Sequence, residues 1–237
     1  MVFRDRKDAG RQLAAKLSGH TGCADCIVLA LPRGGVPVAY EVAEGLGLPL
    51  DVFLVRKLGV PGHEELAMGA IASGGTRIIN DSIVNPLHIS TRAIDRVTQH
   101  EQAELKRRER AYRDDRPAPQ VAGRTVILVD DGLATGATMR AAATALRARG
   151  PKRIIIAVPV AAPETCSELA LEVDEIVCAA TPEPFVGVGL WYQDFSQTSD
   201  EEVRELLEKR RDAIANKTIE VRTAENSGED GAPRGTI

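Results

Sequence analysis

Two adjacent carboxylates followed by a loop of small residues form the segment of the chain best suited to chemistry. Residues 126–138 read Val-Ile-Leu-Val-Asp-Asp-Gly-Leu-Ala-Thr-Gly-Ala-Thr. The glycines of the loop let the backbone approach a phosphate closely, and its threonine hydroxyls can donate hydrogen bonds to it. Asp130 and Asp131 would repel an anion, so they suit the hydroxyls of a polyol or a metal ion. This order predicts a sugar phosphate site, with the phosphate in the loop and ribose hydroxyls on the aspartates.

The phosphate loop is expected to join a strand to a helix. Residues 126–129 have the length and β-branching of a strand buried on both faces, and residues 138–149 carry apolar side chains at helical spacing. Backbone N–H groups at the start of that helix can therefore face an anion, which the helix dipole also favours. An ordinary turn followed by an ordinary helix N-cap is the alternative, and it is weakened by the position directly after a buried strand.

Two further apolar runs end in cations. Residues 27–31 stop at a Pro-Arg-Gly-Gly sequence that contains Arg33, and residues 51–55 end in Arg56 and Lys57. Doubly wound sheets bind ligands outside the carboxyl ends of their strands, so three parallel strands would bring these cations and the aspartates to one crevice. The alternative is a solvated loop charge. The paired glycines make this alternative much weaker for Arg33, and it is modestly weaker for Arg56 and Lys57.

Hydrophobic periodicity supplies the remaining elements of the core. An amphipathic helix is expected at residues 6–17. Strand and helix units are expected at residues 27–46, 51–55, 125–148 and 153–170, with a short strand at 175–178. This succession predicts a five-stranded α/β core.

Residues 126–138 resemble the phosphoribosyl pyrophosphate (PRPP) binding motif of type I phosphoribosyltransferases, which combines a hydrophobic run, two acidic residues and a Thr-Gly-x-Thr loop. The chain has no Gly-x4-Gly-Lys-Ser/Thr and no Gly-x-Gly-x-x-Gly after a strand, so neither common phosphate loop competes. The resemblance covers roughly residues 25–195. It implies an α/β fold with a doubly wound, mainly parallel five-stranded sheet, a small C-terminal hood and a flexible flap.

The resemblance also implies roles for individual residues. Arg33 and Lys57 would offset the charge of the departing pyrophosphate, and Asp130 and Asp131 would orient the ribose, so these four are the catalytic candidates. The loop at Arg33 would receive the pyrophosphate, often through a non-proline cis peptide. Mg²⁺ is the implied cofactor, held mainly through PRPP, with the two aspartates as candidate ligands. The full set of candidate PRPP-binding residues is Arg33, Gly34, Gly35, Arg56, Lys57, Asp130, Asp131, Gly132, Ala134, Thr135, Gly136, Ala137 and Thr138.

Residues 57–80 correspond to the flap that closes over PRPP in this family. Their central part, residues 59–75, is too long and glycine-rich for a minimal connection, and the glycines would serve as hinges. His63, Glu64 and Glu65 lie on this segment. They are either exposed loop residues or parts of the catalytic machinery, and the sequence favours neither reading.

Residues 179–198 correspond to the hood that recognises the base. They include residues 182–195, which hold half of the aromatic residues of a chain that is only 3% aromatic. A flat acceptor could stack there. Packing of the hood against the core is an equally good explanation for Trp191 and Tyr192. The candidate acceptor-binding residues are Phe185, Trp191, Tyr192 and Asp194.

The resemblance implies displacement at the ribose anomeric carbon by a ring nitrogen of a purine-like or other nitrogenous acceptor, with release of pyrophosphate. Members that act on 6-oxopurines place an acidic residue just before the Thr-Gly of the loop. This chain has Ala134 there, which argues against the usual hypoxanthine or guanine chemistry. A PRPP-binding regulator without turnover is the alternative, and hydrolysis or synthesis on another phosphosugar is a third. The cationic loop and long flap favour the enzyme, because a sensor needs neither pyrophosphate release nor exclusion of water.

The composition fits one soluble cytoplasmic enzyme with a single domain over residues 1–216. A chain of 237 residues with 43% apolar content can bury a full core, and its net charge of −4 argues against nucleic acid as the main partner. No apolar run has the length of a membrane span, and the charged residues 4–8 argue against a secretion signal. A long charged helix ending before Pro117 would face solvent or the second copy of a homodimer. Residues 217–237 are polar and aperiodic, so disorder is expected there.

The four cysteines have only half of a metal-site pattern. Cys23 and Cys26 show C-x-x-C spacing, which is typical of zinc knuckles and redox pairs. Cys166 and Cys178 lie far apart in the sequence, and no histidine lies at ligand spacing from either pair. Reduced, structural thiols are therefore expected.

Overall fold

A computed structural model describes residues 2–114 and 116–227 of the chain. Its main sheet has five parallel strands in the order β2-β1-β6-β7-β8, which confirms the predicted α/β class. The strands are β1 (Cys26–Ala30), β2 (Leu50–Val52), β6 (Thr125–Val129), β7 (Arg153–Val160) and β8 (Glu175–Ala180). The central strands β1 and β6 are buried along their whole length, as their continuous apolar runs require.

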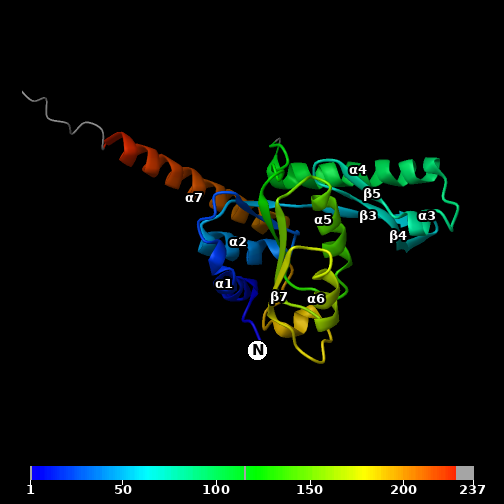
Figure 1. Cartoon of the computed structure of the whole chain (residues 1–237), viewed down its shortest axis with the longest axis horizontal. Coiled ribbons are helices and arrows are strands. Elements are labelled where there is room, and N and C mark those ends of the chain that lie inside the picture. The colour runs from blue at the N-terminus through cyan, green and yellow to red at the C-terminus, as the bar shows by residue number, and fades with distance from the viewer. Residues whose placement is uncertain (1, 115, 228–237) are drawn as a thin grey trace, which may run out of the picture.

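Helices cover both faces of this sheet (Figure 1). Alternate residues of β6 belong to different cores: Ile127 and Val129 share a cluster with α2, whereas Val126 and Leu128 share one with α5. The first face is covered by α1 (Arg6–Lys16), α2 (Gly35–Leu46) and the first turns of α7 (Asp200–Ser227), and the second by α5 (Ala137–Arg147) and α6 (Pro163–Leu169). Among the described residues, no helix is long and apolar enough to cross a bilayer.

The order of the strands places a topological switch point between β1 and β6. The chain leaves β1 toward β2 on one side and leaves β6 toward β7 on the other. Ala30 pairs with Val129, so the last residues of the two strands lie side by side. Open α/β sheets bind ligands at such a point, outside the carboxyl ends of the strands. The loops after Ala30 and Val129 therefore form the natural place for a site.

The segment predicted as a flexible flap forms a second, antiparallel sheet and not a long loop. It consists of β3 (Val55–Val60), β4 (His63–Ala72) and β5 (Thr76–Ile79), followed by the short helix α3 (Asp81–Val84). Strand β2, expected at residues 51–55, ends at Val52, so Arg56 and Lys57 lie within β3 and not at the end of a parallel strand.

Close strand pairing explains the glycines that the sequence suggested as hinges. A Cβ at Gly59 would lie 2.7 Å from the carbonyl oxygen of Glu64, and one at Gly69 would overlap the carbonyl oxygen of Ile78. Leu58 and Met68, the apolar residues that directly precede these two glycines, are buried with residues of α4 (Thr91–Arg113). Burial of this kind makes the segment a structured sheet.

The long charged helix was predicted correctly as α4. The ion pairs Glu104–Arg108 (2.8 Å) and Glu109–Arg113 (3.3 Å) support this helix. One side of α4 is buried, however, through Leu105 and Arg113, and the Arg113 guanidinium also donates to Asp51 at 2.7 Å. This helix therefore fixes the second sheet to the edge of the main one.

The structure describes a helix over residues 217–227, where the sequence predicted disorder. Helix α7 continues through Ser227, and its outer part extends away from the body in Figure 1. Val203 and Leu207 anchor its first turns in the core, and once a helix has formed each further residue adds a hydrogen bond at little cost. The rest of the predicted disordered tail, residues 228–237, lies outside the described residues.

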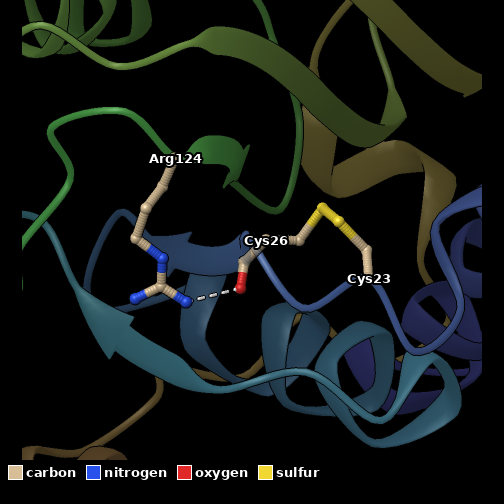
Figure 2. Close-up of a disulfide and its surroundings, with 3 residues drawn as sticks. All are labelled: Cys23, Cys26 and Arg124. Carbon is tan, nitrogen blue, oxygen red and sulfur yellow. Dashed lines mark hydrogen bonds between the residues drawn. A yellow bond between two sulfur atoms is a disulfide. The ribbon is translucent and has the colours of Figure 1, made fainter.

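The expectation of four reduced thiols is also corrected. Cys23 and Cys26 form a disulfide across a tight turn, with Cα atoms 5.3 Å apart (Figure 2). The turn brings the two side chains together because the Cys26 N–H donates to the Cys23 carbonyl at 3.2 Å. Arg124 donates to the Cys26 carbonyl at 2.8 Å, where β1 begins. Cys166 and Cys178 are free, as expected.

Asp174 supplies a pH-dependent contribution to this fold. Its carboxylate accepts the N–H of Ile154 at 2.7 Å and pairs with Arg147 at 2.9 Å, and both contacts lower its pKa from 3.8. On acidification the unfolded chain therefore binds a proton first, so this stabilisation exists above about pH 4 and is lost below it. We expect Asp174→Asn, which keeps an acceptor but not the charge, to lower the free energy of unfolding by about 0.5–1 kcal/mol at pH 7.

Urea unfolding of wild type and Asp174→Asn between pH 7 and pH 3 measures this contribution. The difference in stability between the two should shrink as the pH falls through the range below 4. Asp212→Asn is the control, because Asp212 is 70% exposed on α7. A difference that stays constant down to pH 3 would contradict the assignment.

Candidate active site

The loops after β1 and β6 pack directly against each other. The Pro32–Arg33 peptide bond is cis, as the resemblance implied. A Cβ at Gly34 would overlap the carboxylate of Asp131, and one at Gly35 would lie 2.9 Å from the carbonyl oxygen of Val129. Only glycine lets the two loops come this close. The paired glycines therefore allow the backbone of the first loop to pack against the acidic pair.

The two carboxylates are partly buried at the end of β6. The backbone N–H of Asp131 donates to Oδ1 of Asp130 at 2.9 Å. Burial, and then the neighbouring Asp131 carboxylate, raise the pKa of Asp130 well above its ordinary value. Burial also raises the pKa of Asp131, and the Arg6 guanidinium limits that rise. The pair therefore holds negative charge at a cost, which is typical of a site built for a ligand.

The phosphate loop is held by hydrogen bonds to neighbouring elements and exposes several of its side chains to solvent. Leu133 is buried and its N–H donates to the Val160 carbonyl at 2.9 Å, while Thr165 donates to the Ala134 carbonyl at 2.6 Å. Gly136 has a φ of +67° and starts α5 without a side-chain cap. The side chains that this loop exposes are Ala134, Thr135, Ala137 and Thr138. A firmly held loop with an uncapped helix start and exposed hydroxyls is suited to bind a phosphate.

Arg33 points toward the start of α7. Its Nη1 lies 3.8 Å from Oδ1 of Asp200, which also accepts the Tyr112 hydroxyl at 2.6 Å. Burial and this bond raise the pKa of Tyr112 to about 12. The pairing with Asp200 is loose and Arg33 is 37% exposed, so the guanidinium can turn to an incoming anion.

Arg56 reaches the switch point, whereas Lys57 lies elsewhere. Arg56 lines a small pocket with Pro32 and Thr138, and it donates to Glu101 of α4 at 2.7 Å. Lys57 is absent from that pocket. It bonds the Glu65 carbonyl at 3.1 Å and lines a cleft of about 700 Å³ between β3, β4 and α4.

The three polar residues of the flap that the sequence left open lie at the start of β4. His63, Glu64 and Glu65 are all exposed. Glu64 accepts the Gly62 N–H at 3.3 Å, and Glu65 pairs with Lys57 at 3.4 Å. The contacts of Glu64 and Glu65 are therefore made within the second sheet and not with the acidic pair.

The hood is a short segment that packs on the acidic end of β6. Tyr192 is buried against Phe3, and its hydroxyl donates to the Asp131 carbonyl at 2.6 Å, so it supports the loop and presents no free face. Trp191 and Phe185 are partly buried in the same cluster. Asp194 is exposed and accepts the Ser196 N–H at 2.9 Å. Core packing, one of the two explanations left open, therefore accounts for Tyr192.

Arg6 is a site residue that the sequence did not reveal. It begins α1, yet its side chain is only 12% exposed and donates to Asp131 at 2.9 Å. An arginine at the start of an amphipathic helix looks like a solvated charge. Only the packing of α1 against β7 and β8 and the bond to Asp131 show that it faces the acidic pair.

The family model described as the phosphoribosyl transferase domain matches residues 3–192 of the chain. The chain belongs to the phosphoribosyltransferase family. This phosphoribosyltransferase domain is 42% identical to TT1426 from Thermus thermophilus, whose crystal structure superimposes with a TM-score of 0.79 over 87% of this chain and 98% of that one.

Curated relatives of this phosphoribosyltransferase domain include longer proteins. Rv0571c of Mycobacterium tuberculosis, named as a candidate phosphoribosyl transferase, is 48% identical over 208 residues, which are 88% of this chain and 47% of that protein. The chain thus spans about half the length of such relatives. The bifunctional protein PyrR of Chloroflexus aurantiacus is 39% identical over 142 residues, or 53% of this chain and 65% of that protein.

The described part of this phosphoribosyltransferase domain contains no group of three or more His, Cys, Asp or Glu side chains placed to hold a metal ion. The donors at the switch point are the two carboxylates, one of which already bonds Arg6. Mg²⁺ commonly binds through one or two carboxylates together with substrate phosphates and water. This donor set therefore fits a magnesium ion that arrives largely coordinated by its substrate.

Proposed function

We propose that this chain is an enzyme that binds PRPP with Mg²⁺, transfers the phosphoribosyl group to a nitrogenous acceptor and releases pyrophosphate. One observation carries the proposal. At the switch point of the sheet, the Gly34-Gly35 backbone packs on the Asp130-Asp131 pair, beside an exposed phosphate loop that starts α5. The loop that starts α5, the two aspartates and the Gly34-Gly35 loop thus lie in the order in which the 5-phosphate, the ribose and the pyrophosphate occur in PRPP.

Each part of PRPP has a matching part of the site. The 5-phosphate lies in the loop of residues 134–138, with Thr135 and Thr138 as hydroxyl donors. One oxygen of each aspartate bonds a protein donor, so the other oxygen of each is available for a ribose hydroxyl. The pyrophosphate lies at the cis peptide loop, between Arg33 and Arg56. Lys57 reaches it only with movement of β3 and β4, which would act as the flap.

In this reaction the protein mainly positions the substrates and neutralises the charge of the leaving group. A ring nitrogen of the acceptor forms a bond to the anomeric carbon, the bond from that carbon to the pyrophosphate oxygen breaks, and its electron pair leaves with pyrophosphate. Bound Mg²⁺ supplies charge neutralisation on the leaving group. Arg33 and Arg56 add to it, and the aspartates fix the ribose so that the carbon faces the acceptor. The acceptor's proton passes to solvent.

The acceptor is proposed to be a purine-like or other nitrogenous ring. The hood exposes apolar surface at Val186 and Leu190, 76% and 67% exposed, next to the partly buried Phe185 and Trp191. Such a surface suits a flat heterocycle. Ala134 occupies the position where an acidic proton acceptor for 6-oxopurines would be, so the acceptor is one that needs no such group. Asp194, which is exposed in the hood, is proposed to bond the edge of this ring.

The proposed enzyme is a cytoplasmic homodimer that acts on small molecules and binds neither nucleic acid nor a membrane. Light scattering after gel filtration measures the oligomeric state. The decisive assay is release of pyrophosphate from PRPP and Mg²⁺ against a panel of purines, pyrimidines and small nitrogen heterocycles, beside calorimetric titration with PRPP alone. Release that depends on one acceptor supports the transferase. Tight binding without release from any acceptor replaces it with a PRPP sensor, and no binding overturns both.

A further inference from the structure

Arg6 contacts the acidic pair from outside the sheet. Its Nε donates to Oδ2 of Asp131 at 2.9 Å, and its Nη2 lies 2.9 Å from the same oxygen. Both side chains are largely buried, at 12% and 17% exposed. Within the described part of the chain, no side-chain donor bonds Oδ1 of Asp131. The guanidinium therefore holds one oxygen of the carboxylate and leaves the other for a ligand.

Two further contacts fix the plane of the guanidinium. Its Nη1 donates to the carbonyl of Ser196 at 2.7 Å, and its Cζ lies 4.0 Å from the centre of the Phe195 ring. A planar cation that bonds a carboxylate, bonds a carbonyl and stacks on a ring uses properties that lysine lacks. Phe195 and Ser196 both lie within the hood segment. Arg6 thus connects α1, the acidic end of β6 and the hood.

Arg6 also abuts the loop proposed to bind pyrophosphate. A Cβ at Gly34 would lie 3.3 Å from its Nε. We infer that Arg6 is a positioning residue for ribose binding: it holds Oδ2 of Asp131 so that Oδ1 can accept a ribose hydroxyl, and it locks this carboxylate to the hood. The inference rests on the proposed function, because it assigns ribose to Asp131.

The electrostatics of the pair explain why such a residue is needed. Two adjacent carboxylates at a partly buried strand end repel each other, and without a cation one of them would rotate away or bind a proton. The Arg6 guanidinium donates to Asp131 and not to Asp130, whose Oδ1 accepts the backbone N–H of Asp131 instead. Loss of Arg6 should therefore disturb the ribose site without removing any group from the phosphate or pyrophosphate loops.

Calorimetric titration of the full chain tests this inference with three variants. Arg6→Met removes the charge and keeps the bulk, Arg6→Lys keeps a charge, and Arg11→Met is the control on the same helix, where Arg11 is 50% exposed and pairs with Glu41. We expect Arg6→Met to weaken the binding of PRPP with Mg²⁺ by about 10- to 100-fold, the scale on which misplacing a group costs function. Arg6→Lys should recover part of that loss, and Arg11→Met should bind as wild type.

Two comparisons separate positioning from other roles. Titration with pyrophosphate and Mg²⁺ should give the same affinity for wild type and Arg6→Met, because no pyrophosphate contact is removed. In an Asp131→Asn background, Arg6→Met should add little further loss, since Arg6 acts through Asp131. Thermal melts establish that each variant is folded, and if Arg6→Met is not, Arg6→Lys carries the test.

Three results would overturn the inference or its foundation. Unchanged PRPP affinity in folded Arg6→Met would show that Arg6 only fastens α1 to the core. An equal loss of affinity for pyrophosphate would make Arg6 a direct ligand of the leaving group instead. Failure of the wild type to bind PRPP would overturn the proposed function itself, which distinguishes that failure from the other two.

Discussion

The double substitution Asp130→Asn and Asp131→Asn is expected to abolish measurable PRPP binding while the protein stays folded. Each carboxylate is proposed to accept a hydrogen bond from a ribose hydroxyl, and bonds to a charged acceptor contribute about 1.5–3 kcal/mol each. Loss of both charges therefore weakens binding by roughly 100- to 10,000-fold, since about 1.4 kcal/mol corresponds to tenfold. Asparagine keeps the shape of the side chain, so the effect reports on charge.

The same substitution should leave the fold as stable as before, or more so. Burial raises the pKa of both aspartates, and the neighbouring Asp131 carboxylate raises the pKa of Asp130 further, so their charged forms are disfavoured in the folded protein. Removing two like charges relieves that repulsion and the cost of burying them, which offsets the loss of the Arg6 ion pair because an asparagine oxygen and the Ser196 carbonyl can still accept hydrogen bonds from Arg6. Stability that rises as binding is lost is typical of residues retained for function.

Calorimetry with PRPP and Mg²⁺, together with thermal melts, measures both effects. Glu205→Gln with Glu208→Gln is the matched control, because it removes two exposed carboxylates from α7 without touching the switch point. The control should bind PRPP as wild type does. Retained PRPP binding by the aspartate double variant would mean that the ribose lies elsewhere, and with it the whole site assignment would fail.

The sequence predicted the parts of the site that follow long apolar runs. Val126 to Val129 is unmistakably a buried strand, and a strand of a doubly wound sheet delivers whatever follows it to one edge. The acidic pair, the Gly34-Gly35 loop and the phosphate loop were all predicted from this rule. They lie together in the structure because the parallel strands β1 and β6 end side by side at the same edge of the sheet.

The parts that were missed depend on contacts between distant segments. The second sheet escaped prediction because the glycines of β3 and β4 suggested mobility, whereas each of Gly59 and Gly69 allows a backbone to pass close by. Arg6 escaped because nothing in its neighbours along the chain distinguishes a cation paired with Asp131 from a solvated one. The Cys23–Cys26 disulfide depends on a turn that the spacing of the cysteines permits but does not require.

Gly34→Ala is expected to lower the catalytic efficiency of pyrophosphate release by about 100-fold, the cost of displacing a binding group by about 1 Å. The backbone of Gly34 is right-handed helical, with φ −58° and ψ −32°, so alanine meets no strain in the main chain. The added methyl group alone causes the effect. It would overlap the Asp131 carboxylate and lie close to Nε of Arg6, so either the pyrophosphate loop or the carboxylate must move.

Movement of either the pyrophosphate loop or the Asp131 carboxylate separates the groups that bind pyrophosphate and ribose, whereas the rest of the core is unchanged. We therefore expect the cost in unfolding free energy to stay within about 1–3 kcal/mol, as for other overpacked sites, while PRPP binding and turnover both fall. Gly19→Ala is the matched control, since a Cβ there meets no atom within 4 Å. If Gly34→Ala binds PRPP and releases pyrophosphate at the wild-type rate, then the close approach of the two loops has no part in function, and the carboxylates and the leaving group must be held independently of each other.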